Sequence, residues 1–261
     1  MKPITLISLL LTAVISHAQP AVEATPTPEV TPEQAEQPKK LTPTQEKFLN
    51  LPEESRKDFA KHIGEASRYF QQKRIFEAME EIRLAELIFS DSPQLLNLKA
   101  SCFVEFRDFK NGEFWFKAAL ALDPNSTNIK FNVAEVYFVT GQWAKAVPLY
   151  EEIMQVMPPE NIIQGRLVEF KKLLCLKKLG RHDEVKILAE KYDFLDDSPF
   201  YYYSKAALAF ADGDELKAEE WLGIARRIFT DPNTIAAWDD TLVEFGYIKS
   251  FYGADFIEDP K

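Results

Sequence analysis

Histidine and cysteine are scarce in this chain of 261 residues, which contains three His and two Cys. None of the patterns GxSxG, GxxxxGK[ST], GxGxxG, HExxH or CxxC occurs in it. These patterns mark nucleophile elbows, phosphate and dinucleotide loops, and metal or redox sites. We therefore predict a protein that is not an enzyme and that needs no cofactor or metal ion. The alternative is a hydrolase on a helical scaffold. It depends on one pair of residues, Cys175 and His182, which lie seven residues apart across a predicted helix break.

The two cysteines, Cys102 and Cys175, fall in helical patterns on equivalent faces of separate predicted helices. A disulfide requires Cα atoms within about 7 Å of each other. The two predicted helices are separated by other helices of the chain, so their Cα atoms should lie farther apart than this. We therefore expect two buried free thiols that pack as small apolar groups.

Clustered positive charge is also missing. The chain has 31 Lys and Arg against 41 Asp and Glu, giving a formal net charge of −10. Binding to phosphate backbones needs grouped Lys and Arg side chains. The sequence therefore argues against a nucleic-acid partner and against an anionic membrane surface.

The mostly apolar stretch at residues 4–15 is only 12 residues long, which is too short to span a bilayer as a stable helix. Lys2 precedes it, and the small residues of Ser16-His17-Ala18 follow it. This is the pattern of a secretory signal peptide at residues 1–18. It predicts an exported protein, periplasmic or extracellular, with no transmembrane helix after cleavage. The alternative is a leader that is retained as an anchor.

Residues 19–41 are rich in Pro, Glu, Thr and Gln and show no apolar periodicity. Such a composition cannot bury enough apolar surface to offset the conformational entropy lost on folding. We expect a disordered, fairly extended linker here.

From Thr42 onward the apolar residues follow helical spacing, and no segment alternates with a period of two for long enough to predict a sheet. Thr42, Pro43 and Gln45 have the order of a capping box that opens a helix. Later breaks fall at Pro or Gly, for example at Ser92-Pro93 and Asp212-Gly213-Asp214. The predicted fold class is all-α.

Small and large residues recur when the sequence is shifted by 34 positions. The small classes are Ala66, Ala100 and Ala134, and Ala78, Gly112 and Ala146; the large classes are Tyr69, Phe103 and Tyr137, then Ile75, Phe109 and Trp143, then Ile82, Phe116 and Tyr150. Small residues allow two helices to approach closely, and large residues fill the space beside the pair.

This pattern resembles the tetratricopeptide repeat family, whose 34-residue unit is a helix-turn-helix. The units that begin at Phe59, Pro93, Thr127 and Pro199 fit it well. The fourth unit, residues 166–198, fits poorly, because Leu173, Val185 and Tyr192 replace small residues and about five extra residues precede it.

The resemblance implies an α-solenoid, a right-handed superhelix of about five repeats over residues 59–232. An N-terminal helical cap at residues 42–58 and a C-terminal capping helix and tail at residues 233–261 would cover its ends.

The resemblance also implies a concave groove, lined by the first helix of each pair, that holds a protein or peptide partner. The inward positions of the repeat predict these partner-binding residues: Asn97, Ser101, Asn128, Phe131, Glu135, Phe138, Phe170, Lys177, Tyr203 and Phe210. This groove is aromatic and nearly uncharged, which suits an amphipathic helix or an extended peptide. The alternative is that the same aromatic residues belong to the core.

Three functions remain open. The leading one is an exported adaptor or scaffold that binds a partner in the groove. The second is a structural subunit of an envelope complex that self-associates through an aromatic patch on the helix Trp238–Tyr252. The third is the hydrolase built on Cys175 and His182.

Overall fold

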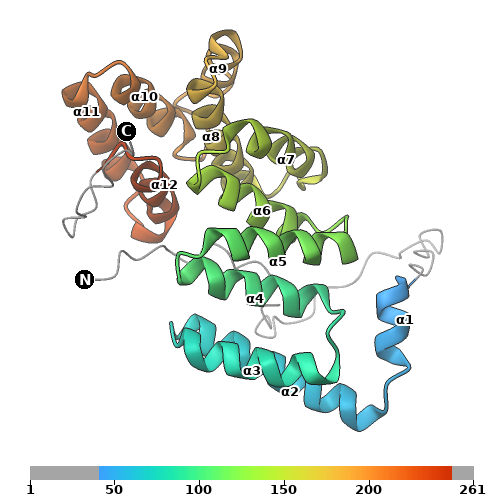
Figure 1. Ribbon diagram of the computed structural model, residues 1–261. Coiled ribbons are helices and arrows are strands. Elements are labelled where there is room, and N and C mark those ends of the chain that lie inside the picture. The colour runs from blue at the N-terminus through green and yellow to red at the C-terminus, as the bar shows by residue number, and fades with distance from the viewer. Residues whose placement is uncertain (1–40, 249–261) are drawn as a thin grey trace, which may run out of the picture.

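The structure is a computed structural model that describes residues 41–248, and every regular element in this range is an α-helix (Figure 1). The predicted signal peptide and most of the predicted linker lie outside the described residues, as does the end of the tail. The helices are α1 (Pro43–Leu49), α2 (Glu53–Gln71), α3 (Ile75–Ile88), α4 (Pro93–Glu105), α5 (Phe109–Leu122), α6 (Thr127–Val139), α7 (Trp143–Val156), α8 (Ile162–Lys178), α9 (His182–Ala189), α10 (Phe200–Ala211), α11 (Glu215–Ile228) and α12 (Pro232–Glu244).

Helices α2 to α11 form five consecutive pairs, and each pair packs on the next (Figure 1). We call the first helix of each pair its inner helix, and each pair is one repeat. The inner helices are therefore α2, α4, α6, α8 and α10. This arrangement confirms the predicted all-α solenoid of five helix-turn-helix repeats.

Small residues bring the two helices of a pair close together. Ala66 and Ala78 are fully buried between α2 and α3, as the 34-residue pattern predicts. Gly112 in α5 lies so near α4 that an added Cβ would stand 2.8 Å from Cγ2 of Val104. A larger side chain at these positions would push the paired helices apart.

In the turn between the two helices of every repeat, one residue has a left-handed backbone conformation, with a positive φ. These residues are Lys73, Arg107, Gly141, Gly180 and Gly213, with φ between 60° and 78°. They follow one another at intervals of 34, 34, 39 and 33 residues. The one long interval locates the extra residues that the sequence predicts before the fourth repeat.

The N-terminal helix begins as expected. The hydroxyl oxygen of Thr42 accepts a hydrogen bond from the amide of Gln45, and the Gln45 side chain accepts one from the amide of Thr42. However, α2 begins at Glu53, six residues before the expected start of the array at Phe59. Pro52 precedes this helix, and Glu53 and Glu54 favour its first turn by interacting with the helix dipole.

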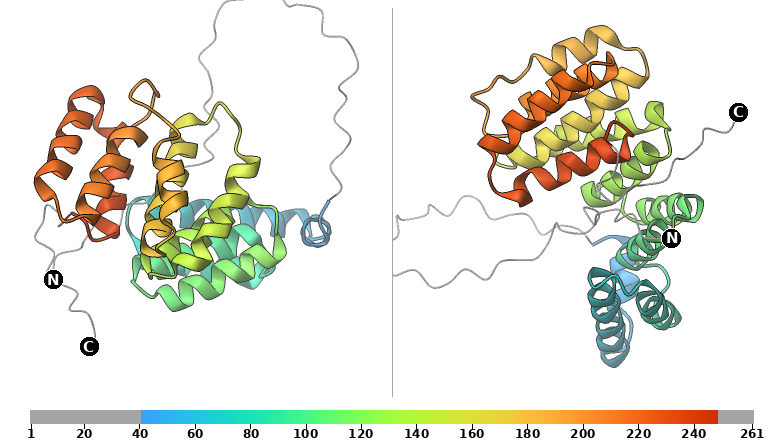
Figure 2. Two further views of the ribbon diagram at one scale, coloured as in Figure 1. Left: turned by 90° about the horizontal axis from the view of Figure 1, so that it is seen from above. Right: turned by 90° about the vertical axis from the view of Figure 1, so that its left-hand side faces the viewer.

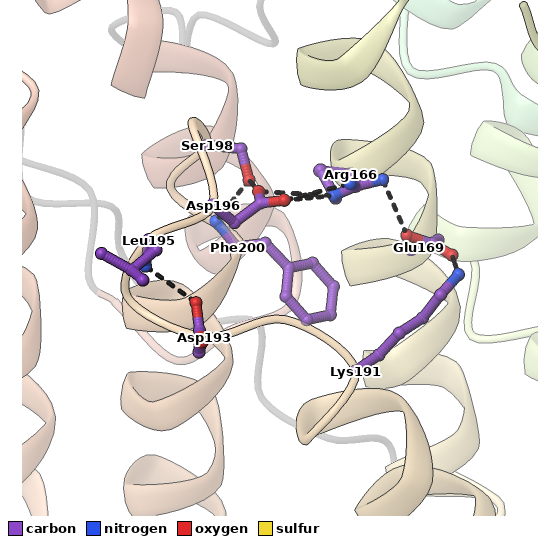
Figure 3. A network of polar contacts seen from close by, with 8 residues as sticks. All are labelled: Arg166, Glu169, Lys191, Asp193, Leu195, Asp196, Ser198 and Phe200. Carbon is purple, nitrogen blue, oxygen red and sulfur yellow. Dashed lines mark hydrogen bonds and ion pairs between the residues drawn. The ribbon is translucent and has the colours of Figure 1, made fainter. Parts of the chain in front are cut away.

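The fourth repeat has a short second helix, because α9 contains 8 residues whereas the second helices of the other repeats contain 14. A loop at residues 190–199 replaces the missing turns, and polar contacts hold it against α8 (Figure 3). Arg166 of α8 donates hydrogen bonds of 3.0 and 3.1 Å to Asp196, and its guanidinium lies 3.5 Å from the centre of the Tyr192 ring. Asp196 in turn accepts a hydrogen bond from the hydroxyl of Ser198, directly before α10.

The C-terminal helix is shorter than expected. The sequence predicts a helix that continues to Tyr252, but α12 ends at Glu244. Gly246 follows with φ +84°, and the amide of Tyr247 bonds back to the carbonyl of Leu242, so the chain turns away from the helix axis.

Candidate partner-binding groove

Helix α12 lies inside the solenoid, along the inner helices α8 and α10, instead of continuing the stack beyond α11 (Figure 2). Its first half meets Phe170 and Tyr203, in the middle of α8 and the first turn of α10. Its C-terminal end reaches Phe138 near the end of α6. We call the surface that α6, α8 and α10 present to α12 the inner groove.

Aromatic rings make most of this contact. Trp238 is fully buried, with its ring centre 5.3 Å from Phe170 and 5.5 Å from Tyr203. Phe245 stacks on Phe138 at 5.6 Å and lies 5.2 Å from Trp143. Leu242 lies one turn after Trp238 on the same face and is also fully buried. Burial of three large apolar side chains of one helix supplies the driving force for its docking.

Tyr247, just beyond α12, extends the aromatic contact. Its ring stacks on Phe210 of α10 at 5.5 Å, with the two planes inclined by 21°. Lys178 of α8 lies 5.1 Å from the centre of the Phe245 ring, within the range of a cation–π contact. The end of the docked segment is therefore fixed to both α8 and α10.

A charged cluster lies inside the same contact. The Nζ of Lys171 is 2.7 Å from a carboxylate oxygen of Glu135 in α6 and 3.3 Å from one of Glu244 in α12. The hydroxyl of Tyr150 donates a 2.7 Å hydrogen bond to the other oxygen of Glu135. Lys171 has a side-chain exposure of 3%. Charges this deeply buried are tolerated only when they are paired and hydrogen-bonded.

The pKa values in this cluster reflect burial and mutual charge. Burial alone would lower the pKa of Lys171, but Glu135 and Glu244 outweigh it, so the pKa of Lys171 is raised. Burial raises the pKa of Glu244, and Lys171 offsets this only in part. Burial also raises the pKa of Asp240 to about 7, with added repulsion from the charges of Glu244 and Asp239.

Two buried polar atoms of α12 have no hydrogen-bond partner among residues 41–248. They are Nε1 of Trp238 and Oδ2 of Asp240. Asp239, by contrast, is well satisfied, because its Oδ1 accepts hydrogen bonds from the hydroxyl of Tyr203 at 2.7 Å and from Arg226 at 3.2 Å. The helix therefore fits the inner groove in shape, but its polar groups are only partly satisfied.

The structure places the ten predicted groove residues in three settings. Asn97, Ser101, Glu135, Phe138, Phe170 and Tyr203 are buried; Phe131, Lys177 and Phe210 are half-buried; Asn128 is exposed. Four of them, Phe138, Phe170, Tyr203 and Phe210, contact α12 or Tyr247 through their rings. Asn97 instead accepts a 2.8 Å hydrogen bond from Asn132, between α4 and α6. Contact of these residues with a partner stays a prediction.

The expectation of a nearly uncharged groove is wrong, because Lys171 and Glu244 form an ion pair inside it. Neither residue was among the predicted groove residues. The inward positions of the repeat select Phe170, whereas its neighbour Lys171 also reaches the inner groove with its long side chain. One signal could have found it. Lys171 lies between Phe170 and the apolar run that begins at Leu173, and it follows Glu135 by 36 residues, close to one repeat length.

The expected exposed aromatic patch on the C-terminal helix is also not found in its described part. Trp238 and Leu242 are fully buried, and Phe245 is nearly so, all within the same chain. The rest of the expected patch, after Ile248, lies outside the described residues.

Both cysteines are buried and unbonded, as predicted. Burial raises the pKa of each thiol to about 12. A nucleophilic cysteine needs an accessible thiol that is readily deprotonated. Cys175 has neither property, and His182 lies exposed at the start of α9, so the structure does not favour the hydrolase alternative.

Comparisons with known proteins agree with this architecture. The family model of YpiA-like tetratricopeptide repeats matches residues 113–157, which cover most of α5 and all of α6 and α7. No curated protein sequence is significantly similar to the chain.

Two solved structures share the fold. The structure of PilF from Pseudomonas aeruginosa has 16% identity and a TM-score of 0.52, and the match covers 74% of this chain and 94% of PilF. YrrB, described as a TPR protein with an unusual peptide-binding site, has 19% identity and a TM-score of 0.50, with 72% and 95% covered. The helix pairs and these similarities show that the chain has the fold of tetratricopeptide repeat proteins, and the family model supports such a repeat at residues 113–157.

Among residues 41–248, no helix is both long enough and apolar enough to cross a bilayer. The leader predicted at residues 1–18 lies outside this range.

Proposed function

We propose that this protein is an exported, non-enzymatic adaptor that holds a helical segment of a partner protein in the inner groove. One observation carries the proposal: the inner groove accommodates an amphipathic helix, because it already holds α12 through Trp238, Leu242 and Phe245.

The chemistry of the groove suits a helical ligand. Aromatic rings on three inner helices provide anchor sites, and Lys171 provides a buried cation among them. Helix-in-groove recognition uses apolar side chains one and two turns apart as anchors. Buried aromatic anchors contribute most of the free energy in such interfaces. YrrB, which is similar in fold, is itself described as having a peptide-binding site.

Export follows from the leader pattern at residues 1–18, and it would place the adaptor in a periplasmic or extracellular space. Cell fractionation and N-terminal sequencing of the mature protein test this part. Export with signal peptide cleavage predicts a mature chain that begins at Gln19. An intact N-terminus in the membrane fraction would support the retained anchor instead.

Partner binding is tested by photo-crosslinking in the native envelope. A photoreactive amino acid replaces Asn128 or Lys177, two accessible residues on the inner helices α6 and α8. The matched control replaces Leu216, which is 83% exposed on α11. The proposal expects one protein to be crosslinked from both inner-helix positions and not from Leu216. Equal yields from all three positions, or no product from any, would contradict groove binding.

A further inference from the structure

We propose that α12 is a displaceable occupant of the inner groove, and that the partner is an amphipathic helix with large apolar residues at positions i, i+4 and i+7, a carboxylate at i+6 and a neutral residue at i+2. This inference rests on the proposed function, since it names the chemistry of the ligand for the same groove. The pattern is that of α12, with Trp238 as position i, except that Asp240 becomes neutral.

The apolar part of the pattern follows from the contacts of α12. Trp238, Leu242 and Phe245 lie at i, i+4 and i+7, on one face of the helix. All three are buried, with Trp238 between α8 and α10 and Phe245 against α6. A ligand that keeps this spacing meets the same three sites.

The charged part of the pattern follows from Lys171. Its Nζ is paired with Glu135 inside the solenoid and with Glu244, at i+6, from the docked helix. Loss of the i+6 carboxylate removes half of the ion pairing of a buried cation. A partner helix therefore needs an acidic residue at this position.

The neutral position follows from the misfit of Asp240. Its Oδ2 is buried without a hydrogen-bond partner among the described residues, and the charges of Glu244 and Asp239 repel it. The carboxylate of Asp240 is thus buried near Lys171, which is already paired with Glu135 and Glu244. A helix without a charge at i+2 avoids this penalty and binds more tightly than α12.

The topology permits exchange. All five helix pairs are complete without α12. Its covalent connection to α11 is the short segment 229–231, and the ion pair between Arg226 and Asp239 also joins the two helices. The helix can therefore leave the groove by rotation at this connection, without opening a repeat. Its departure would expose the rings of Phe138, Phe170 and Tyr203 to water, so the groove is stable in the free protein only while α12 fills it.

The test uses the mature full-length chain and a fluorescent peptide that copies residues 231–248 with the change Asp240→Asn. Binding is followed by fluorescence anisotropy. The tethered α12 competes at an effective concentration in the millimolar range, so the peptide binds the unmodified chain weakly. The change Phe245→Ala in the chain weakens the competitor, and we expect it to lower the Kd of the peptide at least tenfold. The control Ala236→Ser, at an exposed position of α12, should leave the Kd unchanged.

Two further peptides test the charged positions of the pattern. A peptide that also carries Glu244→Gln should bind at least tenfold more weakly, because Lys171 loses its partner. A peptide with the original Asp240 should bind more weakly than the Asp240→Asn peptide. The chain variant Glu244→Gln provides a second weakened competitor if Phe245→Ala prevents folding, which circular dichroism reveals.

The outcomes separate the alternatives. If neither weakened chain binds the peptide although its helicity is normal, α12 is a fixed structural helix and the inference is overturned. If the weakened chains become dimers with exchanged α12 helices in light scattering, the occupant is a second copy and the inference is again overturned. If the peptide fails but photo-crosslinking from Asn128 and Lys177 captures one partner, only this inference fails and the adaptor function stands.

Discussion

The ammonium group of Lys171 lies 3.3 Å from the carboxylate of Glu244, a residue 73 positions later in the chain. This ion pair joins the inner helix of the fourth repeat to α12. Because Lys171 also binds Glu135 of the third repeat, the cluster ties two repeats and α12 together.

Truncation of Lys171 should destabilise the protein severely. Lys171→Ala leaves Glu135 and Glu244 buried without their cation, and such a loss costs about 3–5 kcal/mol of unfolding free energy. Urea denaturation monitored by circular dichroism gives the value. The control Lys186→Ala removes an exposed lysine of α9 and should change stability by less than about 0.5 kcal/mol. A loss of under about 1 kcal/mol for Lys171→Ala would show that water screens the cluster.

Asp240 should make stability fall as the pH rises. Its pKa is about 7 in the folded protein because burial and the neighbouring charges of Glu244 and Asp239 favour the protonated form, whereas the ordinary pKa of an aspartate side chain is 3.8. Between these values the folded state binds more protons than the unfolded state, so the contribution is present below pH 4 and is lost as the pH rises towards 7.

Asp240→Asn should therefore flatten the pH dependence of stability between pH 4 and 7 and stabilise the protein at pH 8, by about 1–2 kcal/mol. Denaturation curves at pH 5, 6, 7 and 8 measure both effects. Glu219→Gln, which neutralises an exposed carboxylate on α11, is the matched control and should leave the profile unaltered. An unaltered profile for Asp240→Asn would contradict the buried environment described for this side chain.

Substitutions at two of the left-handed turn residues should change stability in opposite directions. Arg107 has φ 64°, so Arg107→Gly should stabilise the protein by about 1 kcal/mol. Gly180 has φ 70°, so Gly180→Ala should destabilise it by about 1 kcal/mol. The control Gly64→Ala lies within α2, where no atom obstructs a Cβ, and should stabilise by about 1 kcal/mol. Thermal denaturation of the three variants separates the effect of turn geometry from general glycine replacement.

The loop at residues 190–199 should depend on the forked geometry of Arg166. Arg166→Lys keeps the charge but cannot reproduce the two hydrogen bonds to Asp196, and the loss should cost about 1–2 kcal/mol. Hydrogen exchange should show faster exchange confined to this loop and the first turn of α10. Arg227→Lys, at an exposed position of α11, is the control. Uniformly faster exchange over the whole array would contradict a local role.

The thiols should be inert in the folded protein. Both Cys102 and Cys175 are buried, and burial raises the pKa of each to about 12, so neither forms an accessible thiolate at pH 8. A colorimetric thiol reagent should detect no fast-reacting thiol under native conditions and two after denaturation. Rapid reaction of Cys175 in the native state would revive the hydrolase alternative.

The sequence predicts the fold well because the repeat information is local. Ala66 and Ala78, or Ala134 and Ala146, pack within one helix pair, so their 34-residue recurrence is enough to define the pair. The left-handed turn residues repeat in the same way. Only the start of α2 and the end of α12 differ clearly from the predicted boundaries, and both depend on local turn chemistry at Pro52 and Gly246.

The position of α12 could not be predicted in the same way, because its contacts are distant in sequence. Trp238 packs on Phe170, and Phe245 packs on Phe138, more than sixty residues away in each case. The apolar spacing of α12 shows that the helix has a face to bury, but not which surface of the array receives it. A terminal cap and a groove occupant have the same amphipathic pattern.

The path of the chain after α11 also fixes how the molecule responds to mechanical load. Because α12 follows the last repeat and docks back on α8, a pull on the C-terminal end reaches α12 before any helix pair. The connection at residues 229–231 then carries the load to α11. With α12 displaceable as proposed, tension on this end would act against its contacts with the inner groove, so that force as well as ligand concentration would control access to the groove.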